Sequence, residues 1–343
     1  MAYTTINDPT DYFNTKLYAG NSGTQSITGV NFQPDFLWIK RRNIAGDHNL
    51  VDVIRTSDKT LMSNSTDAEY SNSTITSFDS DGFSLSGSDG ALNASGSNYV
   101  AWNWLANGTG SSNTAGSINS TVSVSATSGF SIVSYTGTGS AGATIGHGLG
   151  VAPNVIITKS RTASNRYWGV YHSSLGNTGS MALNSNQAFD TSTTYWNDTT
   201  PSSTLFTVGT NGDTNSSGTM IAYCFAQKQG YSKFGSYTGN ANTDGAFVYC
   251  GFRPAFVMIK STALNSWEIL DNKRNPSNVA GKSIFPDGSG AEYDYTNRID
   301  ILSNGFKART TSDGVNGSGI NYMYMAFAEF PFTSSTGTPV TAR

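Results

Sequence analysis

The chain has 343 residues, a formal net charge of −3 and 13% charged residues, about half the usual ~25%. This near-neutral charge gives no electrostatic basis for binding nucleic acid or an anionic membrane. With 37 glycines, 37% hydrophobic and 12% aromatic residues, the composition argues against disorder and favours an all-β protein with many turns.

The N-terminal stretch lacks both the basic region and the apolar core of a signal peptide. No apolar run approaches the ~20 residues that a bilayer-spanning helix needs. We therefore expect a soluble protein without membrane insertion.

Three stretches share one pattern, in which a proline precedes a largely apolar run and a closing lysine. They are residues 34–40, 153–159 and 254–260. Proline fits the first position of a strand, where no ladder donor is lost. The β-branched and aromatic run predicts a buried strand, and we expect the lysine to return the chain to water.

The flanks of these stretches also recur. Tyr18, Tyr135 and Tyr237 precede the three prolines by 16, 18 and 17 residues. Downstream, an Asn with a Gly three residues later leads each time into an aromatic strand, at Asn93, Asn215 and Asn316. The pattern predicts three tandem homologous β-sandwich modules, jelly-roll-like and each of about 100 residues.

The predicted boundaries follow from these repeats. Module 1 covers residues 1–107 and includes a polar N-terminal leader, module 2 covers 129–230 and module 3 covers 231–332. A linker rich in Gly, Ser, Thr and Asn covers 108–128, and its alternating second half, 118–124, indicates an added strand. A polar tail at 333–343 is expected to be mobile.

Cysteines and histidines give no sign of catalysis. Cys224 and Cys250 are too few for a disulfide framework, and two buried free thiols are favoured over a bridge between modules. His48, His147 and His172 fall at non-equivalent places, so we expect ordinary surface or turn histidines. Neither a zinc-binding spacing nor a nucleophile motif is present.

Two further motifs fail their structural tests. Residues 137–142 match G-x-G-x-x-G, but the glycine-rich sequence after them cannot start the helix that a dinucleotide site needs. Residues 79–82 and 211–215 resemble pieces of calcium loops without the bidentate Glu. Asx-Gly turns explain them more simply, with calcium as the alternative. With no recurring carboxylate pair, we expect no enzyme, no cofactor and no metal.

A tryptophan follows the proline stretch in two modules, at Trp168 and Trp267. Each precedes a short apolar segment, 170–172 or 269–271. We interpret this as a core strand with an aromatic plug. The alternative is an aromatic platform for a sugar, which requires an exposed ring.

Several runs resemble a repeat domain of virion proteins from marine tailed phages, of the cyanophage and pelagiphage type. These are residues 11–21, 29–40, 146–153, 230–240 and 326–332, and the resemblance covers nearly the whole chain. Proteins of this kind are labelled tail-fibre-like or structural. The resemblance therefore implies a virion component made in the host cytoplasm, and it carries no catalytic residues.

The leading functional hypothesis is a surface protein of the virion, such as a tail fibre or adhesin. It would contact other virion proteins and bind host glycan through the aromatic residues Trp168, Tyr171, Tyr195 and Trp196. The alternatives are a capsid-decorating or tail-joining protein and, third, a polysaccharide depolymerase. A homo-oligomer such as a trimer is expected by default, and a monomer with three modules about a pseudo-threefold axis is the alternative.

Overall fold

The computed structural model describes residues 3–331 and 333. Within them, the helical elements are η1 (Pro9–Asp11) and the short helix α1 (Gly212–Asn215), and the other regular elements are β-strands. The predicted all-β class is therefore confirmed. The remaining residues of the predicted leader, third module and tail lie outside the described part of the chain.

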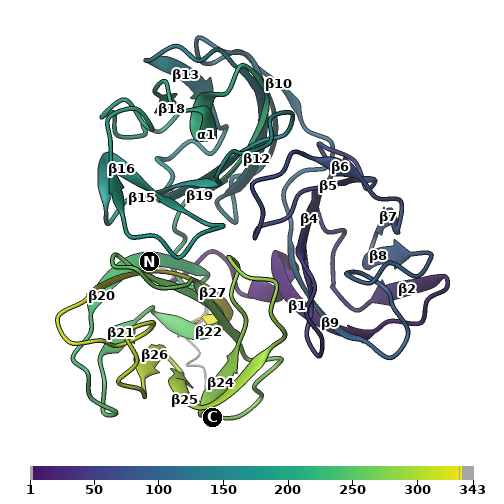
Figure 1. The fold of residues 1–343 in the computed structure, drawn as a ribbon, viewed down its shortest axis with the longest axis vertical. Coiled ribbons are helices and arrows are strands. Elements are labelled where there is room, and N and C mark those ends of the chain that lie inside the picture. Colours follow the sequence, from purple (N-terminus) through teal and green to yellow (C-terminus); the bar gives the residue numbers. More distant parts are fainter. Residues whose placement is uncertain (1–2, 332, 334–343) are drawn as a thin grey trace.

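The strands form three lobes around a common centre (Figure 1). Lobe 1 contains β1 (Phe13–Ala19), β2 (Gln25–Thr28), β3 (Phe36–Arg41), β4 (His48–Asp52), β5 (Lys59–Thr60), β6 (Tyr70–Ser71), β7 (Ile75–Asp79), β8 (Gly82–Leu85) and β9 (Asn98–Trp104). Lobe 2 contains β10 (Ser111–Asn113), β11 (Ser120–Ser125), β12 (Phe130–Gly137), β13 (Ala143–Gly146), β14 (Val155–Ser160), β15 (Gly169–His172), β16 (Gly176–Ala182), β17 (Asp190–Thr191), β18 (Leu205–Val208) and β19 (Gly218–Phe225). Lobe 3 contains β20 (Ser232–Thr238), β21 (Phe247–Tyr249), β22 (Phe252–Ser261), β23 (Glu268–Asp271), β24 (Ala280–Ser283), β25 (Tyr293–Leu302), β26 (Gly305–Ala308) and β27 (Asn321–Pro331).

Each lobe turns one antiparallel sheet, here called its inner sheet, toward the centre. The inner sheets have the orders β1-β9-β3-β4, β12-β19-β14-β15 and β20-β27-β22-β23. The outer sheets β2-β8-β7, β13-β18 and β21-β26-β25-β24 lie behind them. In lobe 2 the inner sheet grows to eight strands, because β10 and β11 from the predicted linker join one edge and β16 and β17 the other.

The proline stretches become strands that are apolar on both faces. In β3, Phe36 and Trp38 face the centre of the molecule, whereas Leu37 and Ile39 face the core of lobe 1. This alternation is the two-residue period of a strand. Since both faces are covered, the run is continuously hydrophobic and not alternating.

The three inner sheets share one apolar core at the centre. The Trp104 ring of lobe 1 lies 6.3 Å from Phe225 of lobe 2 and 5.6 Å from Phe327 of lobe 3, between ring centroids. Phe36 and Tyr223 stack across the junction of lobes 1 and 2 at 4.2 Å. Because every lobe contributes rings to this core, the lobes stabilise one another.

A ring of hydrogen bonds surrounds the shared core. One residue of each lobe occupies a corresponding position in this ring: His48, Trp168 and Trp267. Each lies four residues before the residue that pairs in register with the strand residue Phe36, Val155 or Phe256. Each ring N–H donates to a backbone carbonyl of a neighbouring lobe, at 3.0 Å to Phe285, 2.9 Å to Met62 and 2.8 Å to Ala182. The Nδ1 of His48 accepts from the indole of Trp38, which places the proton of His48 on Nε2.

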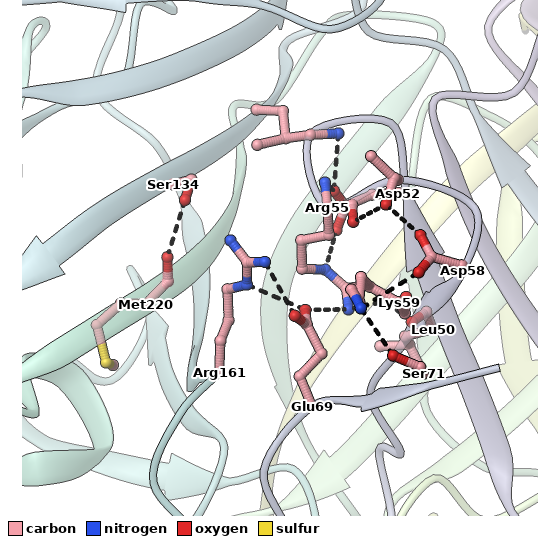
Figure 2. A network of polar contacts seen from close by, with 12 residues as sticks. Leu50, Asp52, Arg55, Asp58, Lys59, Glu69, Ser71, Ser134, Arg161 and Met220 are labelled. Atoms are coloured by element: carbon pink, nitrogen blue, oxygen red, sulfur yellow. Dashed lines mark hydrogen bonds and ion pairs between the residues drawn. The ribbon is translucent and has the colours of Figure 1, made fainter.

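Buried charges close the junction between lobes 1 and 2 (Figure 2). The Arg55 guanidinium pairs with Asp52 and lies 3.1 Å from a Glu69 carboxylate oxygen. Arg161 of lobe 2 binds the other oxygen of Glu69 at 2.9 Å. The hydroxyl of Tyr223 donates to Asp52 at 2.8 Å, so each buried charge has a partner.

The junction between lobes 3 and 1 repeats this arrangement. Arg274 pairs with Asp271 and with Glu292, and Glu292 also binds Arg42 of lobe 1. The indole N–H of Trp102 donates to Asp271 at 3.1 Å, in the place that the hydroxyl of Tyr223 has at the first junction.

In lobe 2, His172 occupies the position that Asp52 and Asp271 have in the other lobes. Its Nε2 lies 3.2 Å from the backbone oxygen of Tyr324. Burial lowers the pKa of His172 to about 4, so this junction is bridged by a neutral ring.

The closing lysines do not return the chain to water, so that expectation is wrong. Lys40, Lys159 and Lys260 are buried, and each ammonium donates to backbone carbonyl oxygens at the end of its own strand or in the loop that follows. Burial lowers the pKa of each lysine to about 8. The lysines therefore pair with backbone carbonyl oxygens at or just beyond the ends of their strands.

We predict that Asp52→Asn destabilises the fold by up to about 3–5 kcal/mol, because the buried Arg55 charge loses the closer of its two carboxylate partners and keeps only Glu69. Asp58→Asn is the matched control, since Asp58 pairs with Lys59 near the surface and such pairs contribute about 1 kcal/mol or less. Urea unfolding followed by tryptophan fluorescence measures both. Equal effects of the two variants would show that the buried network does not stabilise the junction.

The buried lysines also predict a pH dependence. Above about pH 8 the folded chain loses protons that the unfolded chain keeps up to its normal lysine pKa, ~10.4. Deprotonation of the lysines alone should therefore raise stability between about pH 8 and 10, by an amount on the order of 1 kcal/mol per lysine. The buried thiols and tyrosines, whose pKa is raised by burial, act in the opposite direction over the same range. The lysine contribution is therefore measured as a difference: urea midpoints across this range should rise less, or fall more, in Lys260→Met than in the exposed control Lys273→Met. Parallel pH profiles of the two variants would contradict the prediction.

Candidate ligand pocket in the second lobe

Lobe 2 contains a cavity of about 350 Å³ between β15, β16, β17 and the segment that carries α1. Both aromatic and polar groups line it. They include Tyr167, Gly169, Asp190, Tyr195, Asn211 and Asp213. A concave site with a few polar groups and an aromatic wall is typical of small-molecule binding.

The cavity exists because lobe 2 lacks the side chains that fill this place elsewhere. Gly169 pairs with β14 in the register position that Asn49 and Glu268 hold in lobes 1 and 3. In lobe 1, Tyr70 donates to Asn49 at 3.1 Å. In lobe 3, Arg298 donates to Glu268 at 2.8 Å. Neither pair has a counterpart at Gly169.

Glycine at position 169 is also required by close packing. A Cβ atom there would lie 2.9 Å from the hydroxyl oxygen of Thr158. Because Thr158 donates to the backbone oxygen of Asp213 at 2.9 Å, moving it would disturb the α1 segment. The opening of the cavity is therefore fixed by the backbone of lobe 2.

Two carboxylates line the cavity. One oxygen of Asp213 accepts a hydrogen bond from the backbone N–H of Tyr167 at 2.8 Å, and Asn211 caps the backbone of α1. Burial raises the pKa of Asp213, while that hydrogen bond and the charges of Arg166 and Lys159 act in the opposite direction. Asp190, on β17, accepts from the hydroxyl of Tyr195 at 2.8 Å.

The structure separates the four aromatic residues that the sequence proposes as ligand contacts. Trp168, Trp196 and Tyr171 are only 0%, 1% and 3% exposed. Trp168 lies in the central core, while Tyr171 and Trp196 pack edge to face in the core of lobe 2. They cannot present a ring face to a sugar, which corrects the expectation and supports the core interpretation of Trp168.

Tyr195 is the member of that set whose ring is only half-buried, and it lines the cavity. Trp168 also borders the cavity, although its side chain is buried in the central core. Three other lining residues, Tyr167, Asp190 and Asp213, are absent from the predicted set. The Tyr167 side chain is 39% exposed. An alignment of the three modules places Gly169 at the position of Asn49 and Glu268. The missing side chain at this position is the signal in the sequence that could have indicated the cavity.

The histidines are buried and not on the surface, which corrects a second expectation. His48 and His172 bridge lobes, and the ring of His147 lies 3.3 Å from the backbone oxygen of Ser202. Burial lowers the pKa of all three. They are therefore neutral structural groups.

The other predicted motifs lie in connecting segments. Residues 137–142 connect β12 to β13, which belong to different sheets, so they form a loop and not a hairpin. Residues 211–215 form the capped helix α1 and not a simple turn. Asp81 accepts from the backbone N–H groups of Gly29 and Asn31. Within residues 3–331 and 333, no group of three or more His, Cys, Asp or Glu side chains could hold a metal, and no helix is long and apolar enough to cross a membrane.

Cys224 and Cys250 are both buried free thiols, as favoured from the sequence. Burial raises the pKa of both thiols well above the usual range. A buried, protonated thiol reacts slowly because the thiolate is the nucleophile.

We therefore predict that a thiol reagent such as dithiobis(nitrobenzoate) labels neither cysteine in the native protein. Both thiols should react within minutes once denaturant opens the core. Absorbance at the wavelength of the released thiolate gives the count. Fast labelling of either cysteine without denaturant would contradict the packing of its lobe.

A family model described as a domain of unknown function, DUF7483, matches residues 8–331. No curated protein and no solved structure matches the chain.

Proposed function

The chain belongs to the DUF7483 family, and we propose that it is a virion surface protein that binds a host glycan in the lobe 2 cavity. The observation that carries the proposal is the cavity itself, with an exposed aromatic ring beside groups that accept and donate hydrogen bonds. The resemblance of the sequence to phage virion proteins supports the virion assignment.

The chemistry of the cavity suits a sugar ring. A pyranose presents an apolar C–H face that packs on an aromatic ring and hydroxyls that need hydrogen-bond partners. Tyr167 offers a partly exposed ring. Asp190, Asp213 and Asn211 offer carboxylate and amide groups in the same cavity.

The rigid frame around the cavity also supports binding. One side of the cavity is formed by β15, β16 and β17 of the inner sheet, which packs on the shared core, and loops and α1 form the rest. A site on such a frame loses little conformational entropy when ligand binds. This suits recognition outside a cell, where the protein must keep its shape without chaperones.

A polysaccharide depolymerase is the second candidate, because Asp190 and Asp213 line one cavity. Glycoside hydrolysis requires two carboxyl groups, one of them protonated. The raised pKa of Asp213 is compatible with the acid role. Asp190 is exposed and hydrogen-bonded to Tyr195.

The test measures binding of fluorescently labelled protein to intact candidate host cells and to virions that lack it. We expect saturable cell binding that purified host surface polysaccharide competes. Tyr167→Ala should weaken it about tenfold, equivalent to about 1.4 kcal/mol. Asp190 has the register position that Tyr70 has in lobe 1 and Tyr293 in lobe 3. Asp190→Tyr should therefore fill the cavity with a tyrosine side chain and block ligand binding.

Tyr249→Ala is the matched control, because Tyr249 is 53% exposed on lobe 3. It should bind like the unmodified protein. Binding to virions without binding to cells would overturn the proposal in favour of a capsid-decorating or tail-joining protein. Release of oligosaccharides that Asp213→Asn abolishes would overturn it in favour of the depolymerase.

A further inference from the structure

In lobe 3, side chains of the protein itself occupy the position that is a cavity in lobe 2. Tyr195 and Arg298 occupy corresponding positions, because their backbone oxygens accept from Gly209 and Arg309, the residues that follow β18 and β26. In lobe 3 the guanidinium of Arg298 lies 3.4 Å from the ring centroid of Tyr295. It also pairs with Glu268 at 2.8 Å. A cation on an aromatic ring, bound to a carboxylate, therefore fills this place.

Lobe 2 has lost this cation but has gained carboxylates from other elements. Ala91 in lobe 1 and Gly314 in lobe 3 occupy the position of Asp213. In each lobe the backbone N–H at this position donates to the side chain two residues earlier in the chain. The Asp190 position is occupied by tyrosines in both. Among the described residues that line the cavity, two are acidic and none is basic.

The Asp213 carboxylate has room for another partner. Its side chain belongs to a residue that is only 7% exposed, and one oxygen accepts from the backbone of Tyr167. Within the described part of the chain, no donor lies within hydrogen-bond distance of the second oxygen. The nearby ammonium of Lys159 donates to the backbone oxygen of Arg166, and neither residue lines the cavity. This oxygen is accessible from the cavity, so a ligand that brings a hydrogen-bond donor can bind it there.

We propose that the cavity selects an amino sugar whose amine is free and protonated. The ammonium would lie between Asp213 and Asp190, in the role that the guanidinium of Arg298 has in lobe 3. The sugar ring would pack against Tyr167 and Tyr195, whose π-systems also attract a cation. This inference rests on the proposed function and names the chemical class of its ligand.

Isothermal titration of the full chain with glucosamine, N-acetylglucosamine and glucose tests the inference, at a pH where the free amine is protonated. We expect glucosamine to bind at least about tenfold more tightly than the two uncharged sugars, since a charge-assisted hydrogen bond is stronger than a neutral one. Asp213→Asn should remove this preference. Asp198→Asn, an exposed acid of the same lobe, should keep it.

Each other outcome separates the inference from the proposed function. Equal affinity for the three sugars would overturn the amino-sugar inference and leave glycan binding intact. Putrescine binding without glucosamine binding would also overturn it, because the site would then take a simple diamine. Absence of any sugar binding, together with absence of cell binding, would overturn the proposed function as well.

Asp190→Asn provides a second variant if Asp213→Asn fails to fold, because Asp190 is exposed. It should reduce the preference for glucosamine in the same direction. Protection of Cys224 and Cys250 from thiol reagents verifies that either variant is folded. A folded Asp190→Asn protein with an unchanged preference would contradict the proposed position of the ammonium.

Discussion

The apolar core that the three inner sheets share is the constraint on which the rest of the structure depends. A single sandwich buries one face of each sheet, but here the second face of every inner sheet is apolar too. Its exposure would leave a large hydrophobic patch on each lobe. The three lobes therefore need one another, which explains why rings such as Trp104 and Phe327 converge at the centre.

This arrangement forces polar groups into the junctions between lobes. The solutions at the three junctions have the same geometry but different chemistry. Two use an Asp–Arg pair that accepts a donor from the next lobe, Tyr223 or Trp102, and the third uses a neutral His172. Since removal of one partner from a buried ion pair is costly, these positions constrain each other across lobes.

The candidate site results from differences between the three lobes at equivalent positions of the inner sheets. Where lobe 1 has a Tyr70–Asn49 contact and lobe 3 an Arg298–Glu268 ion pair, lobe 2 has Gly169 and an open cavity. One side of the cavity is the same inner sheet that packs on the central core. The site can therefore vary in chemistry without loss of the frame.

The sequence by itself determined the all-β class and the buried proline strands, because composition and continuous apolar runs are local properties. Whether Cys224 and Cys250 pair was decided by the structure, in which both are free. It could not place Lys40, His48 or Trp168, since the same apolar run fits a surface sandwich or a sheet covered on both faces. Only the tertiary structure decided that the inner sheets face one another. The cavity was equally hidden, because its lining comes from β15, β16, β17, α1 and the loops between them. Gly169 matters only through the side chains absent around it.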